Sequence, residues 1–175
     1  MAMTALDANR AKAQVAKKCD LEISDIKKMT IWGNHSPTMY PDLDNAEIKG
    51  ESASGWINDQ GWIESDFLRI VQQRGKAIID ARGASSATSA ANAAIDTVKA
   101  TLIETPEDDW FSAAVLSDGS YSVPEGLIFG FPLKTDANGK VSIVQDLSIS
   151  EYAQEKIDLT TQELLDEKND IKDLL

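Results

Sequence analysis

Apolar residues recur at helical spacing in several stretches of the chain. The first predicted helix runs from Thr4 to Lys18, is rich in Ala, Lys, Gln and Arg, and has Thr4 as its N-cap. A short helical piece follows at Ile23 to Lys28. From about Trp62 to Ala81 the apolar positions again have helical spacing, with an interruption at Gly75. These stretches predict helices that bury one face.

Two more helices are predicted further along the chain. Residues 83–89 resemble a linker in composition, but helical periodicity resumes at Ala90 and continues to Ile103. We therefore expect a tight turn into an Ala-rich helix, whose small residues allow close approach of another backbone. An acidic helix covers Ser150 to Leu175. Its apolar face consists of Tyr152, Ile157, Leu164 and Ile171.

Short apolar runs between these helices predict strands. Met29 to Trp32 is typical of a buried strand, and Gly33 ends it. Residues 34–44 contain two prolines and several turn formers, so we expect a loop there. Ala46 to Ile48 is a weaker strand that ends at Gly50, as in one arm of a hairpin.

After Pro106 the pattern changes to strands separated by turns. The strand-like runs are Phe111–Leu116, Leu127–Leu133 and Val141–Val144, with Asp-Gly and Asp-Ala-Asn-Gly turns between them. These runs predict an antiparallel meander. The predicted order along the chain is helices, a strand, further helices, antiparallel strands and a last helix. This order indicates an α+β domain rather than a doubly wound parallel sheet.

Length and charge narrow the possible functions. The 175 residues are enough for one domain, and 17 basic against 29 acidic residues give a net charge of −12. Nucleic acid and anionic membrane surfaces are therefore poor candidate partners, because both require a basic patch. No apolar run is long enough to span a membrane, and the N-terminus lacks the features of a signal peptide, so we expect a cytoplasmic protein.

The remaining composition argues against several kinds of site. A single cysteine excludes an internal disulfide, and a single histidine without a Cys-x-x-Cys pair argues against a zinc site. No two glycines are separated by one residue, so G-x-G-x-x-G does not occur, and there is no P-loop. A dinucleotide or nucleoside triphosphate cofactor would have to be bound by another chain or another domain.

His35 is the residue best suited to acid–base chemistry. It follows a predicted strand end, where polar residues often line a cleft, and imidazole titrates near neutral pH. Asp7 is a candidate for the carboxylate that orients it, and Arg10 lies three residues further on the same helical face as a candidate anion receptor. The alternative is a surface histidine and a solvated helical ion pair.

Several segments resemble one enzyme family. Leu6-Asp7-Ala8-Asn9-Arg10 resembles the L-D-x-x-R signature of NAD-dependent malate and lactate dehydrogenases, and Gly33-Asn34-His35-Ser36 resembles their G-x-H-S segment. Segments 82–94 and 123–132 and the Glu163-Leu164-Leu165 triplet resemble later parts of the same family, in the same order. The resemblance covers nearly the whole chain and is strongest to the malate dehydrogenase branch.

This resemblance implies a fold and a chemistry. It implies the C-terminal domain fold of the family, with antiparallel strands packed against several helices. In the family the histidine takes the hydroxyl proton of malate while hydride passes to NAD, and oxaloacetate forms. By resemblance, His35 is this acid–base group, Asp7 supports its charged form, and Arg10 binds the substrate's C1 carboxylate. Ser85 matches a position near the nicotinamide and substrate.

Family members are about twice as long as this chain. Their first half contains the NAD-binding Rossmann domain, so we expect residues 1–175 to form the substrate-binding and catalytic domain alone, with negligible turnover. The family forms homodimers, whereas a separated domain can be monomeric. Two alternatives stay open: a non-catalytic or engineered module, in which Ala5, Ala8 and Thr101 cover a former interface, and a domain of another 2-hydroxy acid dehydrogenase.

Overall fold

The structure is a computed structural model that describes residues 4–174. It has the predicted α+β organisation, and every strand pair in the described residues is antiparallel. The strands form three small sheets. These are β1 (Ile26–Lys27), β4 (Glu47–Ile48) and β5 (Glu51–Ser52); β2 (Thr30–Trp32) and β3 (Tyr40–Asp42); and β6 (Phe111–Leu116), β7 (Ile128–Thr135) and β8 (Val141–Ile143).

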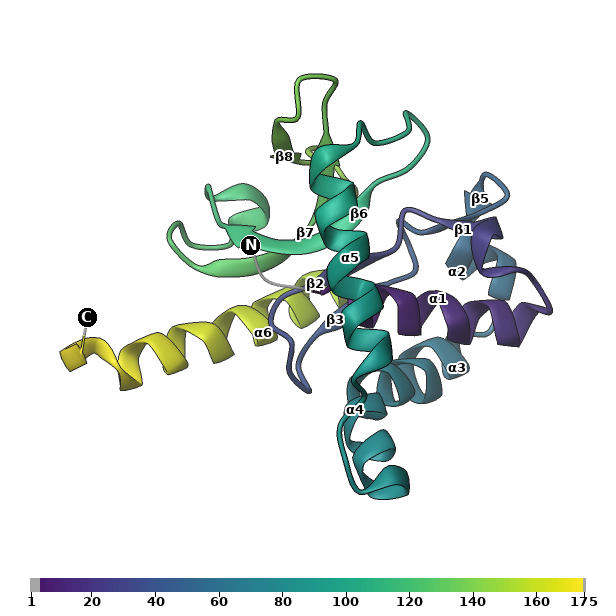
Figure 1. Cartoon of the computed structure of the whole chain (residues 1–175), viewed down its shortest axis with the longest axis horizontal. Helices are drawn as coiled ribbons and strands as arrows, with labels where there is room; N and C mark the ends of the chain where they lie inside the picture. Colours follow the sequence, from purple (N-terminus) through teal and green to yellow (C-terminus); the bar gives the residue numbers. More distant parts are fainter. Residues whose placement is uncertain (1–3, 175) are drawn as a thin grey trace.

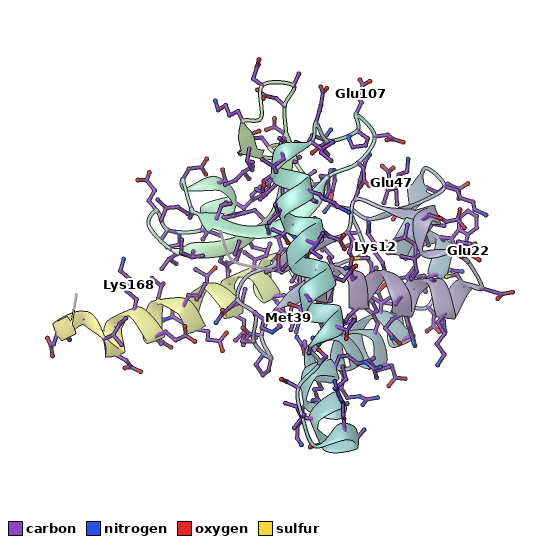
Figure 2. The ribbon with its side chains drawn as sticks, in the orientation of Figure 1. Lys12, Glu22, Met39, Glu47, Glu107 and Lys168 are labelled. Carbon is purple, nitrogen blue, oxygen red and sulfur yellow. The ribbon has the colours of Figure 1, made fainter. Side chains whose placement is uncertain are left out.

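Helices surround the sheets. In Figure 1, α5 crosses the front of the molecule, α1 to α3 lie to one side of it, α4 lies at its lower end, and α6 projects from the other side. The C-terminal part of α6 extends beyond the body, as the outward-pointing Lys168 in Figure 2 shows. The helices are α1 (Ala5–Cys19), η1 (Ile23–Asp25), α2 (Ala53–Ile57), α3 (Gln60–Trp62), the π-helical η2 (Ile63–Phe67), α4 (Leu68–Arg82), α5 (Thr88–Leu102), η3 (Ser120–Ser122), α6 (Glu151–Asp170) and η4 (Lys172–Leu174).

The apolar core consists of two clusters. The first joins α1 to α4 and to the sheet of β1, β4 and β5, and Val15, Ile31 and Val71 are fully buried in it. The second lies between β7 and α6 and centres on Trp32 and Phe131, whose rings meet edge to face with centroids 6.1 Å apart. Burial of these side chains supplies the main favourable contribution to folding. Because β2 contributes Ile31 to one cluster and Trp32 to the other, it joins the two.

Two glycines connect β2 to the large sheet. The amide of Gly33 donates to the carbonyl of Gly130 at 3.3 Å, and the amide of Gly130 donates to the carbonyl of Gly33 at 2.9 Å. A Cβ atom on Gly130 would lie 2.5 Å from the carbonyl oxygen of Ile31, so no larger residue fits this crossing without displacement. The crossing fixes the end of β2 against β7.

The meander and the hairpin are confirmed. The order β6-β7-β8 matches the predicted runs, and Lys49 and Gly50 form a two-residue turn between β4 and β5 with φ of +53° and +87°. Positive φ at both turn positions suits the twist of a tight hairpin. Gly83, at φ +73°, caps α4 and begins the tight turn that leads to α5.

Several expectations about element boundaries are wrong. Only Ile23–Asp25 is helical in the piece predicted at 23–28, because Ile26 and Lys27 pair with β4. The predicted loop at 34–44 contains β3, and Pro41 lies within that strand opposite Ile31. Proline is tolerated there because β3 has a neighbour on one side only.

The helical predictions also need correction. Gly75, which interrupts the apolar stripe, lies inside the continuous helix α4, and the predicted start of this helix contains an irregularity, the π-helical turn η2. Thr4 precedes α1, but its hydroxyl makes no cap hydrogen bond and instead lies 3.2 Å from the hydroxyl of Ser112 on β6. The last α-helix ends at Asp170, so Ile171 does not extend its apolar face and is exposed.

The apolar stripe of α5 faces solvent. Ala93 is the buried residue of this helix, whereas Val98 and Leu102 are 57% and 74% exposed, and Ile95 and Ile103 are exposed beside them. The helix that the periodicity predicts at residues 90–103 is present as α5. The helix contacts α1, and its buried residue, Ala93, is small.

Candidate active site

Asp7 and Arg10 form an ion pair on the first turns of α1. The guanidinium of Arg10 donates from Nη1 to Oδ1 of Asp7 at 3.2 Å, as the spacing of three residues predicts. The side chain of Asp7 is completely buried, and that of Arg10 is 12% exposed. Burial excludes water from the pair, so this contact differs from the solvated helical pair of the alternative interpretation.

His35 contacts the other oxygen of the same carboxylate. Its Nδ1 lies 2.5 Å from Oδ2 of Asp7, although 28 residues separate the two in the chain. The hydrogen bond to Asp7 raises the pKa of His35 above 6.5, partial burial and the charge of Arg10 oppose this rise, and the charge of Asp7 adds to it. Asp7 therefore orients the imidazole and stabilises its charged form.

The end of β2 places His35 at this position. Gly33 has a φ of +91°, which favours glycine and turns the chain out of the strand. A Cβ atom at Gly33 would lie within 2.2 Å of the side chain of Thr160 on α6. The hydroxyl of Thr160 accepts a hydrogen bond from the amide of Asn34 at 3.0 Å. Contact with α6 thus fixes the point at which the chain leaves β2, and with it the position of His35 in the loop that follows.

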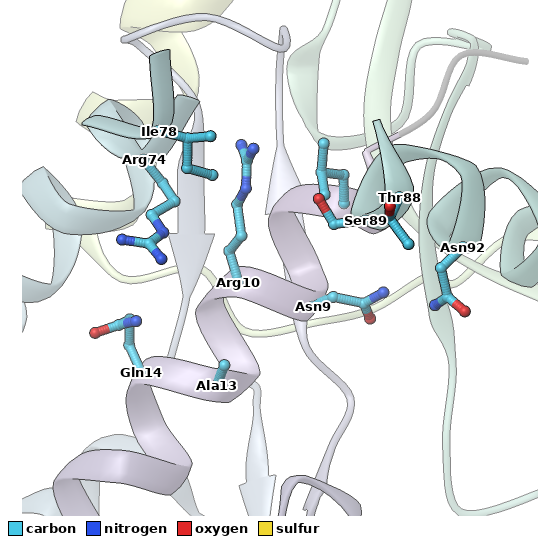
Figure 3. A pocket seen from close by; sticks show the side chains of 10 residues that line it. Asn9, Arg10, Ala13, Gln14, Arg74, Ile78, Thr88, Ser89 and Asn92 are labelled. Carbon is cyan, nitrogen blue, oxygen red and sulfur yellow. The ribbon is translucent and has the colours of Figure 1, made fainter. Parts of the chain in front are cut away.

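A cavity of about 620 Å³ lies beside Arg10, between α1, α4 and α5. Among the residues that line it, the charged ones are Arg10 and Arg74, and Figure 3 shows their side chains on α1 and α4 on neighbouring sides of the cavity. Neutral polar groups of Asn9 and Gln14 line it as well. Asp7 offsets part of the charge of Arg10, and with Arg74 the charge beside the cavity is still positive in a chain with a net charge of −12, which favours anionic ligands.

Ser85 is exposed in the connection between α4 and α5 and is not among the residues that line this cavity. Its carbonyl accepts a 3.4 Å hydrogen bond from Arg82. The hydroxyls of Thr88 and Ser89, at the start of α5, line the cavity instead. A serine-rich run gives no sequence signal that distinguishes one hydroxyl from the next, so the place of Thr88 and Ser89 beside the cavity could not be predicted from the sequence.

The described residues do not form the parallel-stranded fold that is typical of dinucleotide-binding domains. All their strand pairs are antiparallel, whereas a dinucleotide fold needs parallel strands with a glycine-rich turn into a helix. Within residues 4–174, no group of three or more His, Cys, Asp or Glu side chains could hold a metal ion. None of the helices in this part of the chain is both long and apolar enough to cross a membrane.

Comparison with known proteins identifies the fold. The family model of the lactate/malate dehydrogenase alpha/beta C-terminal domain matches residues 4–175. Malate dehydrogenase from Naegleria fowleri is 42% identical, with a TM-score of 0.91 over 99% of this chain and 52% of that chain. Trichomonas vaginalis lactate dehydrogenase, solved with NADH and oxamate, is 30% identical, with a TM-score of 0.89 over 95% of this chain and 52% of that one.

A more distant structure shows the same fold. Malate dehydrogenase from Plasmodium falciparum is 23% identical, with a TM-score of 0.82 over 99% of this chain and 54% of that chain. The chain therefore spans about half the length of the solved relatives that it matches. With a buried aspartate bridging an arginine and a histidine inside the matched region, this chain belongs to the lactate/malate dehydrogenase family through its C-terminal domain.

Proposed function

We propose that the chain is the substrate-binding and acid–base half of a malate dehydrogenase, which interconverts malate and oxaloacetate. The observation that carries the proposal is the buried carboxylate of Asp7, which contacts His35 through one oxygen and Arg10 through the other. One carboxylate thus fixes the position of a proton acceptor relative to an anion receptor. A 2-hydroxy acid presents both a carboxylate and a neighbouring hydroxyl to such a pair.

The geometry supports a role for each of these side chains in the proposed reaction. Because Nδ1 of His35 donates to Asp7, its Nε2 carries the lone pair that takes the substrate's hydroxyl proton. Asp7 then stabilises the imidazolium that results. The planar guanidinium of Arg10 binds the substrate carboxylate through two parallel hydrogen bonds. A nicotinamide cofactor, when bound, supplies the hydride acceptor of this reaction.

Two observations support malate over lactate as the substrate. The Naegleria malate dehydrogenase is more similar to this chain than the Trichomonas lactate dehydrogenase, at 42% against 30% identity. Arg74 also lines the cavity next to Arg10. A second positive charge favours an anion with two carboxylates over one with a single carboxylate.

We further propose that the dinucleotide site lies outside the printed sequence. The chain then binds the substrate but turns over negligibly alone, because hydride transfer requires nicotinamide and substrate to be held together in a closed site. Steady NADH oxidation by the pure chain with oxaloacetate would contradict this part of the proposal. In that case the chain would have to contain a cofactor site that its strand arrangement does not show.

Substrate binding is tested by calorimetric titration with oxaloacetate and with pyruvate. We expect tighter binding of oxaloacetate, and a loss of at least about tenfold in its affinity in Arg10→Gln, because a bidentate charged contact is removed. The matched control is Arg69→Gln, which removes an exposed arginine paired with Asp66 away from the cavity. Equal affinities of the wild type and Arg10→Gln would rule out the proposed substrate site.

The alternative of an engineered, non-catalytic module finds less support. That hypothesis takes Ala8 as a replacement that covers an exposed interface, but Ala8 is buried in the core beside α1's apolar residues. The apolar residues of α5, such as Val98 and Leu102, are still exposed. A surface edited for independence would have replaced these residues first.

A further inference from the structure

Glu163 on α6 holds the loop that follows His35. Its Oε2 accepts a hydrogen bond from the hydroxyl of Ser36 at 2.5 Å and another from the hydroxyl of Thr38. The hydroxyl of Ser36 also accepts from the amide of Thr38 at 3.1 Å. Hydrogen bonds to an ionised carboxylate are stronger than those between neutral groups. This carboxylate therefore joins both hydroxyls of the loop to one helix.

The neighbouring turns of α6 contact the residue on the other side of His35. Thr160, one turn before Glu163, accepts from the amide of Asn34, and Glu167, one turn after it, accepts from the side-chain amide of Asn34 at 3.3 Å. The three α6 residues lie at i, i+3 and i+7, so they share one face of the helix. This face of α6 holds the chain immediately before and after His35, while Asp7 contacts the ring from α1.

The core anchors the two ends of this loop, through the crossing of Gly33 with Gly130 and through buried Met39, whose carbonyl accepts a hydrogen bond from Gln72 at 2.9 Å, but its middle has few other contacts. β2 ends at Trp32 and β3 begins at Tyr40, and the main-chain hydrogen bond within the intervening segment runs from the amide of Met39 to the carbonyl of Ser36 at 3.1 Å. His35 itself is exposed. A short, partly exposed loop with few backbone hydrogen bonds of its own samples several conformations unless side chains restrain it.

We propose that Glu163 is a positioning residue for His35, which it holds against Asp7 by fixing Ser36 and Thr38. The importance of Glu163 for catalysis rests on the proposed function, in which His35 is the proton acceptor. The geometric part of the proposal stands on the hydrogen bonds alone. Nothing in it requires contact between Glu163 and the substrate.

The charges around His35 indicate that Glu163 acts through the loop rather than through its field. The ionisable groups that face the ring are Asp7 and Arg10 on α1, and these two account for the charge effects on its pKa. Glu163 and Glu167 face the neighbouring loop residues from α6. Loss of Glu163 should therefore change the pKa of His35 only by loosening its contact with Asp7.

The test is the pKa of His35 measured by NMR titration of the only imidazole in the sequence. In Glu163→Ala we expect a downward shift, smaller than that in Asp7→Asn, because the hydrogen bond to Asp7 is what raises this pKa. Glu163→Gln keeps an acceptor oxygen and should recover most of the wild-type value. Glu155→Ala, which removes an exposed acidic residue of the same helix, should leave it unchanged.

A double variant separates positioning from electrostatics. In an Asp7→Asn background, Glu163→Ala should produce no further shift, because the contact that it protects is already lost. If Glu163→Ala fails to fold, the variant with both Ser36→Ala and Thr38→Val removes the same hydrogen bonds from the loop side and should give the same downward shift. It leaves the helix intact.

Three results would overturn the proposal. The first is a pKa of His35 in Glu163→Ala that equals the wild-type value while the melting temperature of the variant is lower. This result would mean that Glu163 has a purely structural role. The second is a full additional shift in the Asp7→Asn background, which would mean a direct charge effect. The third is a wild-type pKa in the Ser36 and Thr38 variant. None of these measurements involves oxaloacetate. The proposed function is tested separately, by substrate binding, so its failure can be distinguished from failure of the proposal about Glu163.

Discussion

Asp7 is completely buried at the start of α1, whereas the ring of His35, which contacts it at 2.5 Å, is 56% exposed. The carboxylate is thus held in a fixed position by the core, and the imidazole presents its other edge to solvent. Such an arrangement is typical of a proton acceptor whose tautomer is set from inside the protein and whose substrate arrives from outside. It also couples the ionisation of His35 to the stability of the fold.

That coupling predicts a pH-dependent contribution of His35 to stability. Because the hydrogen bond to Asp7 raises the folded-state pKa above 6.5, the contribution is complete below the pKa of the unfolded chain and is lost as pH rises through the folded-state pKa. We expect the difference in unfolding free energy between the wild type and His35→Gln to shrink as pH rises from about 5.5 to about 8.5. Urea denaturation at several pH values measures it, and a pH-independent difference would contradict the prediction.

Replacement of the buried carboxylate of Asp42 is expected to destabilise the fold. It is completely buried, and burial raises its pKa although hydrogen bonds oppose the rise. Its oxygens accept from the indole of Trp32 at 3.0 Å, from the side chain of Asn45 at 2.9 Å and from two backbone amides. Asp42→Ala should lower the unfolding free energy by about 2–4 kcal/mol, because it leaves buried donors without acceptors.

The control for this prediction is Glu51→Ala, which removes an exposed carboxylate from β5. Surface changes of this kind stay within about 0.5 kcal/mol of the wild type. Chemical denaturation of both variants measures the difference. If Asp42→Ala changed stability no more than Glu51→Ala, the buried network around Trp32 would not contribute as described.

Gly130 and Gly75 should respond in opposite directions to alanine. A Cβ at Gly130 would lie 2.5 Å from the carbonyl of Ile31, so Gly130→Ala should destabilise by about 2 kcal/mol or more through displacement of β2 from β7. No atom lies within 4 Å of a Cβ at Gly75, which is inside α4, so Gly75→Ala should stabilise by about 0.5–1 kcal/mol. Thermal denaturation compares the two, and similar effects of both would show that the close crossing is absent.

The exposed apolar face of α5 predicts self-association of the chain. Val98 and Leu102 stand out from a surface that is otherwise rich in acidic residues, and exposed apolar patches of this kind mark interaction sites. Sedimentation velocity should show a mass that rises with concentration in the wild type and a monomer in Val98→Lys with Leu102→Lys. The melting temperature should stay the same, since both side chains are exposed. A wild type that is monomeric at all concentrations would contradict this prediction.

Local patterns in the sequence predicted the elements, and long-range contacts decided their details. The strand before Gly33 and the meander after Pro106 follow from apolar runs and turn residues, and both are present. β3 was missed because Pro41 and its neighbours have the composition of a loop, and only pairing with β2 makes them a strand. The exposure of the apolar stripe of α5 could not be predicted either, because periodicity defines a stripe but not what the stripe faces.

The candidate site divides in the same way. The Asp7–Arg10 pair follows from helical spacing and is confirmed as an ion pair. The contact between Asp7 and His35 depends on how β2 packs beside α1, which no local pattern contains, so before the structure it was supported only by resemblance to a family. Glu163 was noted only as part of a similar C-terminal segment. Its role in holding the loop depends on the position of α6, far along the chain.

The central claim is that Asp7 and His35 form a preformed site for a 2-oxo or 2-hydroxy acid. An NMR pH titration of His35, with and without oxaloacetate, in the wild type and in Asp7→Asn, tests it most directly. We predict a pKa above 6.5 in the wild type, a change on adding oxaloacetate, and a lower pKa in Asp7→Asn. A pKa near 6.5 that responds neither to oxaloacetate nor to the substitution would contradict the claim, because it would show that the pair is not assembled in this chain.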